Sequence, residues 1–187
     1  MEEDLNEAIS ILKKGGVILY PTDTIWGIGC DATNAKAVQR IYEIKKRAEN
    51  KAMLVLLDSA DKLDRYVEDV PDVALELSEL SEKPVTIIYN NAYNLASNLL
   101  GENNSVGIRI SRDAFTQKLC ARLRRPIVST SANISGQPTA ATFPEISDEI
   151  KAAVDYIVHY RRDDLTPHQP SSVIKIASDL TFKILRP

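Results

Sequence analysis

Apolar residues follow two spacings along this chain, and each spacing predicts a different element. Apolar side chains that recur every three or four positions predict helices near 5–12, 38–44, 63–67, 73–80 and 115–123. Short apolar runs between polar turns predict strands at 17–20, 53–57, 85–89, 106–110 and 126–129. In one of these runs Val106, Ile108 and Ile110 alternate with Gly107 and Arg109, the period of a half-buried strand. Helices and strands therefore alternate through the first two thirds of the sequence.

Capping and turn residues mark the ends of several of these elements. Gly15 and Gly16 end the first helix, and Asn34 is placed to cap the second helix at its N-terminus. Ser59 and Ser111 are expected to cap the helices that follow them. After residue 136 the pattern predicts a short helix at 145–151 and short strands at 156–158, 172–176 and 182–185. We therefore expect a single α/β domain over residues 1–187, built on an open, mixed, twisted sheet with flanking helices.

Composition narrows the class of protein. The 187 residues are 44% hydrophobic and carry a formal net charge of −3, which argues against a general nucleic-acid-coating role. The two cysteines, Cys30 and Cys120, lack metal-ligand spacing, so we expect a reducing compartment with neither a disulfide framework nor a zinc site. No apolar run approaches the roughly 20 residues of a membrane helix, and the acidic N-terminus is unlike a signal peptide. The sequence predicts a soluble cytoplasmic protein without membrane contact.

Two groups of cations stand out against this negative net charge. The first consists of Lys45, Lys46, Arg47 and Lys51, and the second consists of Arg122, Arg124 and Arg125. Each group is typical either of a solvated face or of a phosphate site, and charge alone does not choose between these alternatives.

Two polar turns follow strand-like runs and are the first candidates for a binding site. One is Pro21–Thr24, and the other crowds five hydroxyl or amide side chains into 129–135 and closes on Gly136. Such side chains offer donors and acceptors, and a turn closed by glycine can present backbone N–H groups to an anion. The alternative is a polar turn that only hydrogen-bonds to itself.

Several standard catalytic sites are absent from the sequence. It contains no Walker-type phosphate loop, no Gly-x-Gly-x-x-Gly and no Gly-x-Ser-x-Gly motif. The two histidines, His159 and His168, have no partner at metal-ligand spacing, so neither a hydrolytic triad nor a metal held by the protein is expected.

The remaining polar groups combine cations and hydroxyls without a nucleophile and base pair. They are Thr22, Asp23, Thr24, Lys45, Arg47, Lys51, Thr86, Ser129, Ser131, Asn133, Ser135, Ser171, Ser172 and Arg186. Such a set suits the positioning and charge neutralisation that phosphoryl or nucleotidyl transfer needs. A structural protein with ordinary polar loops is the alternative that composition leaves open.

Six blocks in order along the chain resemble the YrdC-like family of threonylcarbamoyl-AMP synthases. They span 14–31, 44–47, 105–110, 126–136, 170–173 and 184–187, and the Pro-Thr-Asp-Thr and Thr-Ser-Ala-Asn-Ile-Ser-Gly blocks together are specific. The resemblance implies an open α/β fold with a large concave, basic cavity. It also implies a reaction of L-threonine, bicarbonate and ATP that gives threonylcarbamoyl-AMP and pyrophosphate. In the family this product serves tRNA modification by separate partner proteins.

The same resemblance implies roles for particular residues. Two match positions with a catalytic role, namely Lys45 and Arg47. Seven match positions around ATP, namely Arg47, Lys51, Thr86, Ser131, Asn133, Thr139 and Arg186. Three match positions around threonine, namely Thr24, Ser129 and Ser171. The arginine and lysine side chains, together with Mg²⁺, would neutralise the charge of two anions that must approach each other.

The chain also departs from the family pattern. The departures are at six places, namely Trp26, Ala52-Met53, Leu56, Lys83, Asn90 and Ser111. Those at Ala52, Lys83 and Asn90 touch the expected pocket, which leaves substrate choice and turnover open. The alternatives are a YciO-like paralogue of unclear activity and a non-catalytic module whose basic concavity binds RNA. The intact block 130–136 favours the synthase, because such paralogues tend to lose its asparagine.

Overall fold

The computed structural model describes residues 1–47, 53–176 and 182–187. Its α-helices are α1 (Glu2–Lys13), α2 (Ala35–Ile44), α3 (Asp72–Leu80), α4 (Ala114–Leu123) and α5 (Asp148–Ala153). Its strands are β1 (Ile18–Tyr20), β2 (Gly27–Gly29), β3 (Leu54–Leu57), β4 (Val85–Tyr89), β5 (Val106–Ile110), β6 (Ile127–Ser131), β7 (Tyr156–Ile157), β8 (Ser172–Ile176) and β9 (Phe182–Arg186). Short 3₁₀ helices are η1 (Ala60–Arg65), η2 (Ser97–Leu99), η3 (Glu102–Asn104) and η4 (Phe143–Glu145).

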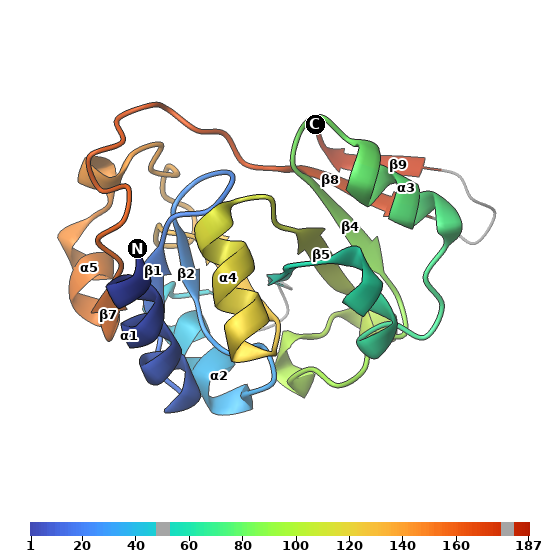
Figure 1. Ribbon diagram of the computed structural model, residues 1–187, viewed down its shortest axis with the longest axis horizontal. Coiled ribbons are helices and arrows are strands. Elements are labelled where there is room, and N and C mark those ends of the chain that lie inside the picture. Colours follow the sequence, from blue (N-terminus) through green and yellow to red (C-terminus); the bar gives the residue numbers. More distant parts are fainter. Residues whose placement is uncertain (48–52, 177–181) are drawn as a thin grey trace.

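The strands of the described chain form one mixed sheet in the order β7-β1-β2-β6-β3-β5-β4-β8-β9 (Figure 1). The pairs β1–β7, β3–β5 and β4–β8 are parallel, and the others are antiparallel. This arrangement confirms the expected mixed sheet with flanking helices. Because β8 lies beside β4, the end of the chain returns to a strand that is far from it in the sequence.

Helices α1 and α4 pack together against one face of the sheet (Figure 1). There Phe115 and Leu119 of α4 join Leu56 of β3 and Ile127 of β6 in one buried cluster. Residues next to these on the strands belong to a second cluster, to which α2 contributes. Successive side chains of a strand point to opposite faces, so the two clusters lie on the two sides of the sheet.

Many of the predicted elements are present within the described residues. The strands at 85–89, 106–110 and 172–176 match the prediction to the residue. The Asn34 side chain caps α2 as expected, because its Oδ1 accepts hydrogen bonds from the backbone N–H groups of Lys36 and Ala37 at 3.1 and 3.2 Å. None of the described helices combines the length and hydrophobicity of a bilayer-spanning segment.

Other expectations about the elements were wrong. Ser59 precedes the 3₁₀ helix η1 rather than an α-helix and makes no side-chain capping hydrogen bond. The cap of α4 is Asp113 rather than Ser111, since its carboxylate accepts from the Thr116 N–H at 2.8 Å. The helix predicted at 145–151 begins later, at Asp148. Strand β2 was not predicted.

Candidate functional site

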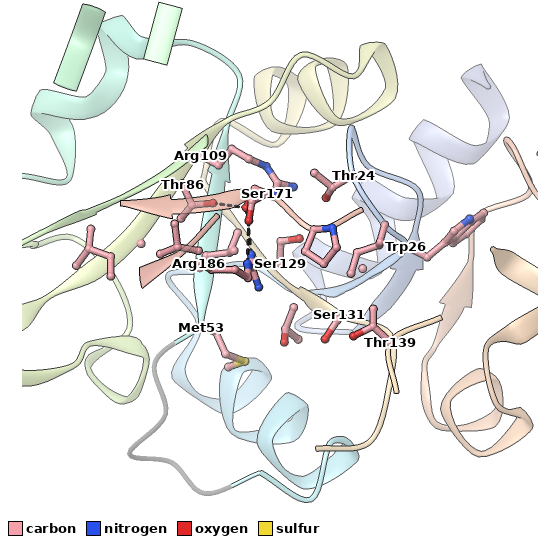
Figure 2. Close-up of a pocket in the computed structure, with 18 of the residues that line it drawn as sticks. Thr24, Trp26, Met53, Thr86, Arg109, Ser129, Ser131, Thr139, Ser171 and Arg186 are labelled. Atoms are coloured by element: carbon pink, nitrogen blue, oxygen red, sulfur yellow. Dashed lines mark hydrogen bonds between the residues drawn. The ribbon is translucent and has the colours of Figure 1, made fainter. Parts of the chain in front are cut away.

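A pocket of about 280 Å³ opens over the middle of the sheet (Figure 2). Its walls come from segments that are far apart in the sequence: the turn before β2, the segment that follows α2, strands β3 to β6, the segment after β6 and the C-terminal hairpin. The pocket lies on the face that α1 and α4 cover in part. On β6, for example, Ile127 packs under α4, while Ser129 and Ser131 on the same side of the strand line the pocket.

The pocket brings together eight residues that the sequence placed in one site. They are Thr24, Arg47, Thr86, Ser129, Ser131, Thr139, Ser171 and Arg186. Lys45 and Asn133 are described but are not among the lining residues. The predicted ATP contact at Lys51 lies outside the described residues, as does the departure at Ala52. The convergence was expected, whereas the individual roles of the eight residues stay predictions.

Two glycines, Gly27 and Gly107, form the bottom of the pocket, the glycine floor, and leave it deep because they have no side chain. Gly27 of β2 pairs with Ser131, and Gly107 of β5 pairs with Leu54. A Cβ added to Gly27 would lie 3.1 Å from Ser129 Oγ, and one added to Gly107 would lie 3.1 Å from the Thr86 methyl group. Side chains at these two positions would therefore crowd the polar groups of the site.

Three polar residues on one side of the pocket are joined by hydrogen bonds (Figure 2). Thr86 Oγ1 and Ser171 Oγ are 2.8 Å apart, and Arg186 Nε donates to the Ser171 carbonyl at 2.8 Å. A further Arg186 nitrogen lies 3.3 Å from Ser171 Oγ. The pairing of β4 with β8 and of β8 with β9 produces this wall, because it aligns three segments that the sequence keeps apart.

Arg109 is a pocket residue to which the sequence pattern assigned no role. It is 3% exposed, and one of its terminal nitrogens lies 3.0 Å from Asp23 Oδ1. Its Nε is buried and has no hydrogen-bond partner among the described residues. Burial lowers the pKa of Arg186, and the positive charge of Arg109 lowers it further. The alternation along β5 predicts that the face carrying Arg109 is exposed, but segments that are distant in the sequence bury that face.

The described lining therefore contains three guanidinium groups, from Arg47, Arg109 and Arg186, and no carboxylate. Burial lowers the pKa of Arg47 as well as that of Arg186. A partly desolvated cation interacts more strongly with an anionic ligand than one in water does. Beyond these three groups, the large basic cavity that the resemblance implies stays a prediction.

The turn at Thr24 satisfies both interpretations that the sequence left open. Thr22 Oγ1 donates to the Ile25 carbonyl at 2.8 Å and accepts from the Thr24 N–H at 3.0 Å, so the turn does hydrogen-bond to itself. These bonds also hold Thr24 at the edge of the pocket. The turn is thus both self-bonded and part of the site.

Lys45 supports the site without lining the pocket. Its side chain is buried, and Nζ donates to the carbonyls of Ser131 at 2.5 Å and of Asn133 at 2.6 Å. The Ser135 N–H in turn donates to the Lys45 carbonyl at 2.9 Å. In this geometry Lys45 positions the turn that carries Ser131, and its catalytic role stays a prediction.

The Asn133 amide likewise serves its own turn. Its Nδ2 donates to the carbonyls of Ile134 at 3.1 Å and Gln137 at 2.7 Å. These bonds close the turn, and Asn133 is not among the residues that line the pocket, so its contact with ATP stays a prediction.

Substitution of Lys45 by methionine should change how stability depends on pH. Burial, with a smaller contribution from Arg47, lowers the pKa of Lys45 from 10.5 to about 8. Between these two values the unfolded chain holds a proton that the folded chain has lost, so the Lys45 contribution to the free energy of unfolding rises with pH. The wild type should gain about 2–3 kcal/mol relative to Lys45→Met across this window. Urea unfolding of both proteins from about pH 7 to about pH 10.5 measures the difference.

Lys46→Met is the matched control, because the exposed Lys46 ammonium pairs with Glu149 at 2.7 Å. The control should show no comparable gain over the same pH range. A stability difference between wild type and Lys45→Met that stays constant with pH would contradict the interpretation.

Comparisons with known proteins agree with this geometry. Residues 10–187 match a family model described as "Telomere recombination", the model of the Sua5, YciO and YrdC proteins. The chain is 33% identical to a threonylcarbamoyl-AMP synthase of Pseudoalteromonas translucida over 179 residues, which cover 94% of this chain and 95% of the relative.

Solved structures show the same fold. The structure of E. coli YciO superposes with a TM-score of 0.86 and 28% identity, covering all of this chain and 89% of that one. The structure of P. abyssi Sua5 complexed with L-threonine gives a TM-score of 0.88 at 23% identity. It matches all of this chain, which spans about half (54%) of the Sua5 chain.

Proposed function

The chain belongs to the Sua5/YciO/YrdC family, and we propose that it is a threonylcarbamoyl-AMP synthase acting on L-threonine, bicarbonate and ATP. The observation that carries the proposal is the convergence of eight expected polar residues on one pocket. A relative of nearly equal length carries this activity in its name, which supports the assignment. Within this proposal the enzyme is a nucleotidyltransferase, and residues 1–187 act as one domain.

The proposed reaction joins two anionic reactants in two steps. The amine of threonine attacks the carbon of bicarbonate, water leaves, and a carbamate forms. A carbamate oxygen then bonds to the α-phosphorus of ATP, while the bond to the bridging oxygen breaks and pyrophosphate leaves with its electron pair. Because carbamate and triphosphate repel each other, the protein must neutralise charge and hold the two groups in line.

The lining residues provide both functions in this proposal. Arg47 and Arg186 bind the phosphates of ATP, since a guanidinium group can donate two parallel hydrogen bonds to an oxyanion. Arg109 binds the carboxylate of threonine, which would satisfy its buried and unpaired Nε. Hydroxyl groups orient the two substrates: Thr24, Ser129 and Ser171 on threonine, and Thr86, Ser131 and Thr139 on the nucleotide.

Mg²⁺ enters this proposal as part of the MgATP substrate. No group of three or more His, Cys, Asp or Glu side chains among the described residues is arranged to hold a metal ion. The lining offers hydroxyls and guanidinium groups, which suit the phosphate oxygens rather than the cation. The ion would neutralise charge on the triphosphate, next to Arg47 and Arg186.

The sequence left two other functions open, and the pocket supports the synthase over both. A YciO-like paralogue would have the same fold, but eight of the residues expected around threonine and ATP line one pocket here. An RNA-binding module would need a basic concavity but not this ordered set of hydroxyls. Use of the product in tRNA modification, contact with partner proteins and a cytoplasmic location stay predictions.

One assay tests the proposed function. Pyrophosphate release from ATP should require L-threonine and bicarbonate together, and omission of either should lower the rate to background. The product should have the mass of threonylcarbamoyl-AMP. Two results would contradict the proposed synthase activity: pyrophosphate release that does not depend on threonine, or strongly salt-dependent RNA binding without ATP consumption.

A further inference from the structure

A second pocket, of about 350 Å³, opens at the other end of β3. Leu54 at the start of this strand lines the first pocket, and Leu57 at its end lines the second. Three residue steps along a strand separate the two by about 10 Å. The proposed synthase reaction makes no use of this second pocket.

Two segments bring cations to the second pocket. The 3₁₀ helix η1 supplies Lys62 and Arg65, and the turn that follows α4 supplies Arg124 and Arg125. Arg124 adopts a left-handed conformation with φ of 58°, which ends α4 and turns the chain toward β6. These residues include part of the second cationic group of the sequence, which the proposed reaction does not use.

The charges of this pocket are not balanced by its carboxylates. Asp58 is the acidic residue in the described lining and pairs with Lys62, while Arg125 pairs with the buried Asp31 at 2.6 Å. Four cations thus line the pocket, and two of them are paired with carboxylates. Arg65 and Arg124 make no ion pair with an acidic side chain within the described residues, which leaves two positive charges for a ligand.

Other cations of α4 behave differently. Arg122 and Lys118 both pair with Glu2 of α1, at 2.7 and 3.8 Å, and do not line the pocket. The ion pairs with Glu2 therefore account for Arg122 and Lys118 without any ligand. Arg65 and Arg124 also lie at helix ends, where cations are favoured. They differ from Arg122 in that they come from two separate elements, line the same opening and lack an acidic partner within the described residues.

We propose that this pocket binds a phosphoryl group. Guanidinium groups match phosphate oxygens with several donors in a fixed geometry, and a phosphoryl anion can take up both of the unpaired charges. The half-buried Tyr66 also lines the pocket, and its phenol O–H can donate a further hydrogen bond. The phosphoryl group comes either from a free anion such as pyrophosphate or from the backbone of RNA.

The test measures pyrophosphate binding by calorimetry at low salt. Arg47→Ala is the starting protein, so that the first pocket contributes little, and the lone tryptophan, Trp26, reports on that pocket by its fluorescence. Adding Arg65→Ala and Arg124→Ala should weaken binding at least about tenfold. Adding Lys118→Ala and Arg122→Ala removes the same charge outside the pocket and should change binding less than about twofold.

Three results would overturn the proposal: no pyrophosphate binding by the starting protein, equal weakening in both double variants, or a Trp26 response that follows the whole binding isotherm. A second arm distinguishes the sources by titrating RNA into the same proteins. If Arg65→Ala and Arg124→Ala together weaken RNA binding and reduce its salt dependence, the ligand is backbone phosphate. If they weaken pyrophosphate binding alone, the ligand is a free anion.

This second site stands apart from the proposed synthase activity. In an otherwise wild-type protein, Arg65→Ala with Arg124→Ala should leave threonine-dependent pyrophosphate release unchanged. Circular dichroism should confirm that the variant is folded. Failure of the synthase assay would leave the calorimetric result in place, and failure of the calorimetry would leave the synthase assay in place.

Discussion

Replacement of Arg47 by alanine should lower threonine- and bicarbonate-dependent pyrophosphate release by about 100-fold or more. Arg47 follows α2 and lines the pocket, and burial lowers the pKa of its guanidinium group. In the proposed reaction it neutralises charge on ATP as pyrophosphate departs. Loss of one such preorganised donor typically costs about 100- to 1,000-fold in rate. Initial rates at saturating threonine, bicarbonate and MgATP measure the effect.

The fold should survive this substitution, because Arg47 comes after the last residue of α2 and its side chain is only half-buried. Lys46→Ala is the control for the local charge, since Lys46 is exposed and pairs with Glu149. Its rate should stay within about twofold of wild type. Wild-type pyrophosphate release by Arg47→Ala would refute the assigned role.

The second large effect concerns the buried pair of Arg109 and Asp23. Arg109→Met should reduce activity by about 100-fold and should also lower the free energy of unfolding by about 3–5 kcal/mol, because it leaves the Asp23 carboxylate buried without its cation. Asp23→Asn added to Arg109→Met removes the uncompensated charge. We expect the double variant to regain most of the stability and none of the activity.

Denaturant unfolding and the pyrophosphate assay, run on the same preparations, separate the two effects. A double variant that regains activity along with stability would show that Arg109 serves the fold alone. In that case the carboxylate of threonine must bind elsewhere in the pocket.

The elements with a dense local signal could be predicted from the sequence. A mostly apolar run predicts β4, and alternation predicts β5, because both patterns reflect burial of a regular strand. Strand β2 carries no such pattern: it is three residues long and two of them are glycine. It forms because β1 and β6 lie on either side of it, which no local window contains.

Some residues of the candidate site could also be predicted from local sequence, and others could not. Crowded hydroxyl groups in the sequence are enough to mark Thr24 and Ser131 as polar turn residues. Arg109 was missed, because the alternation of β5 predicts a polar face while Asp23, 86 positions away in the chain, encloses it. The position of Lys45 depends on two backbone carbonyls at and beyond the end of β6, and no residue type encodes their direction.

The glycine floor has a consequence for the size of molecule that the protein accepts. Gly27 and Gly107 each stand under a polar side chain, with only 3.1 Å between an added methyl group and its neighbour. The depth of the pocket that a ligand can fill thus depends on the absence of a side chain at Gly27 and at Gly107. A glycine-to-alanine substitution at either position would make the pocket shallower. The size of the substrate that binds can therefore be changed in this protein without altering the arginines that bind charged groups.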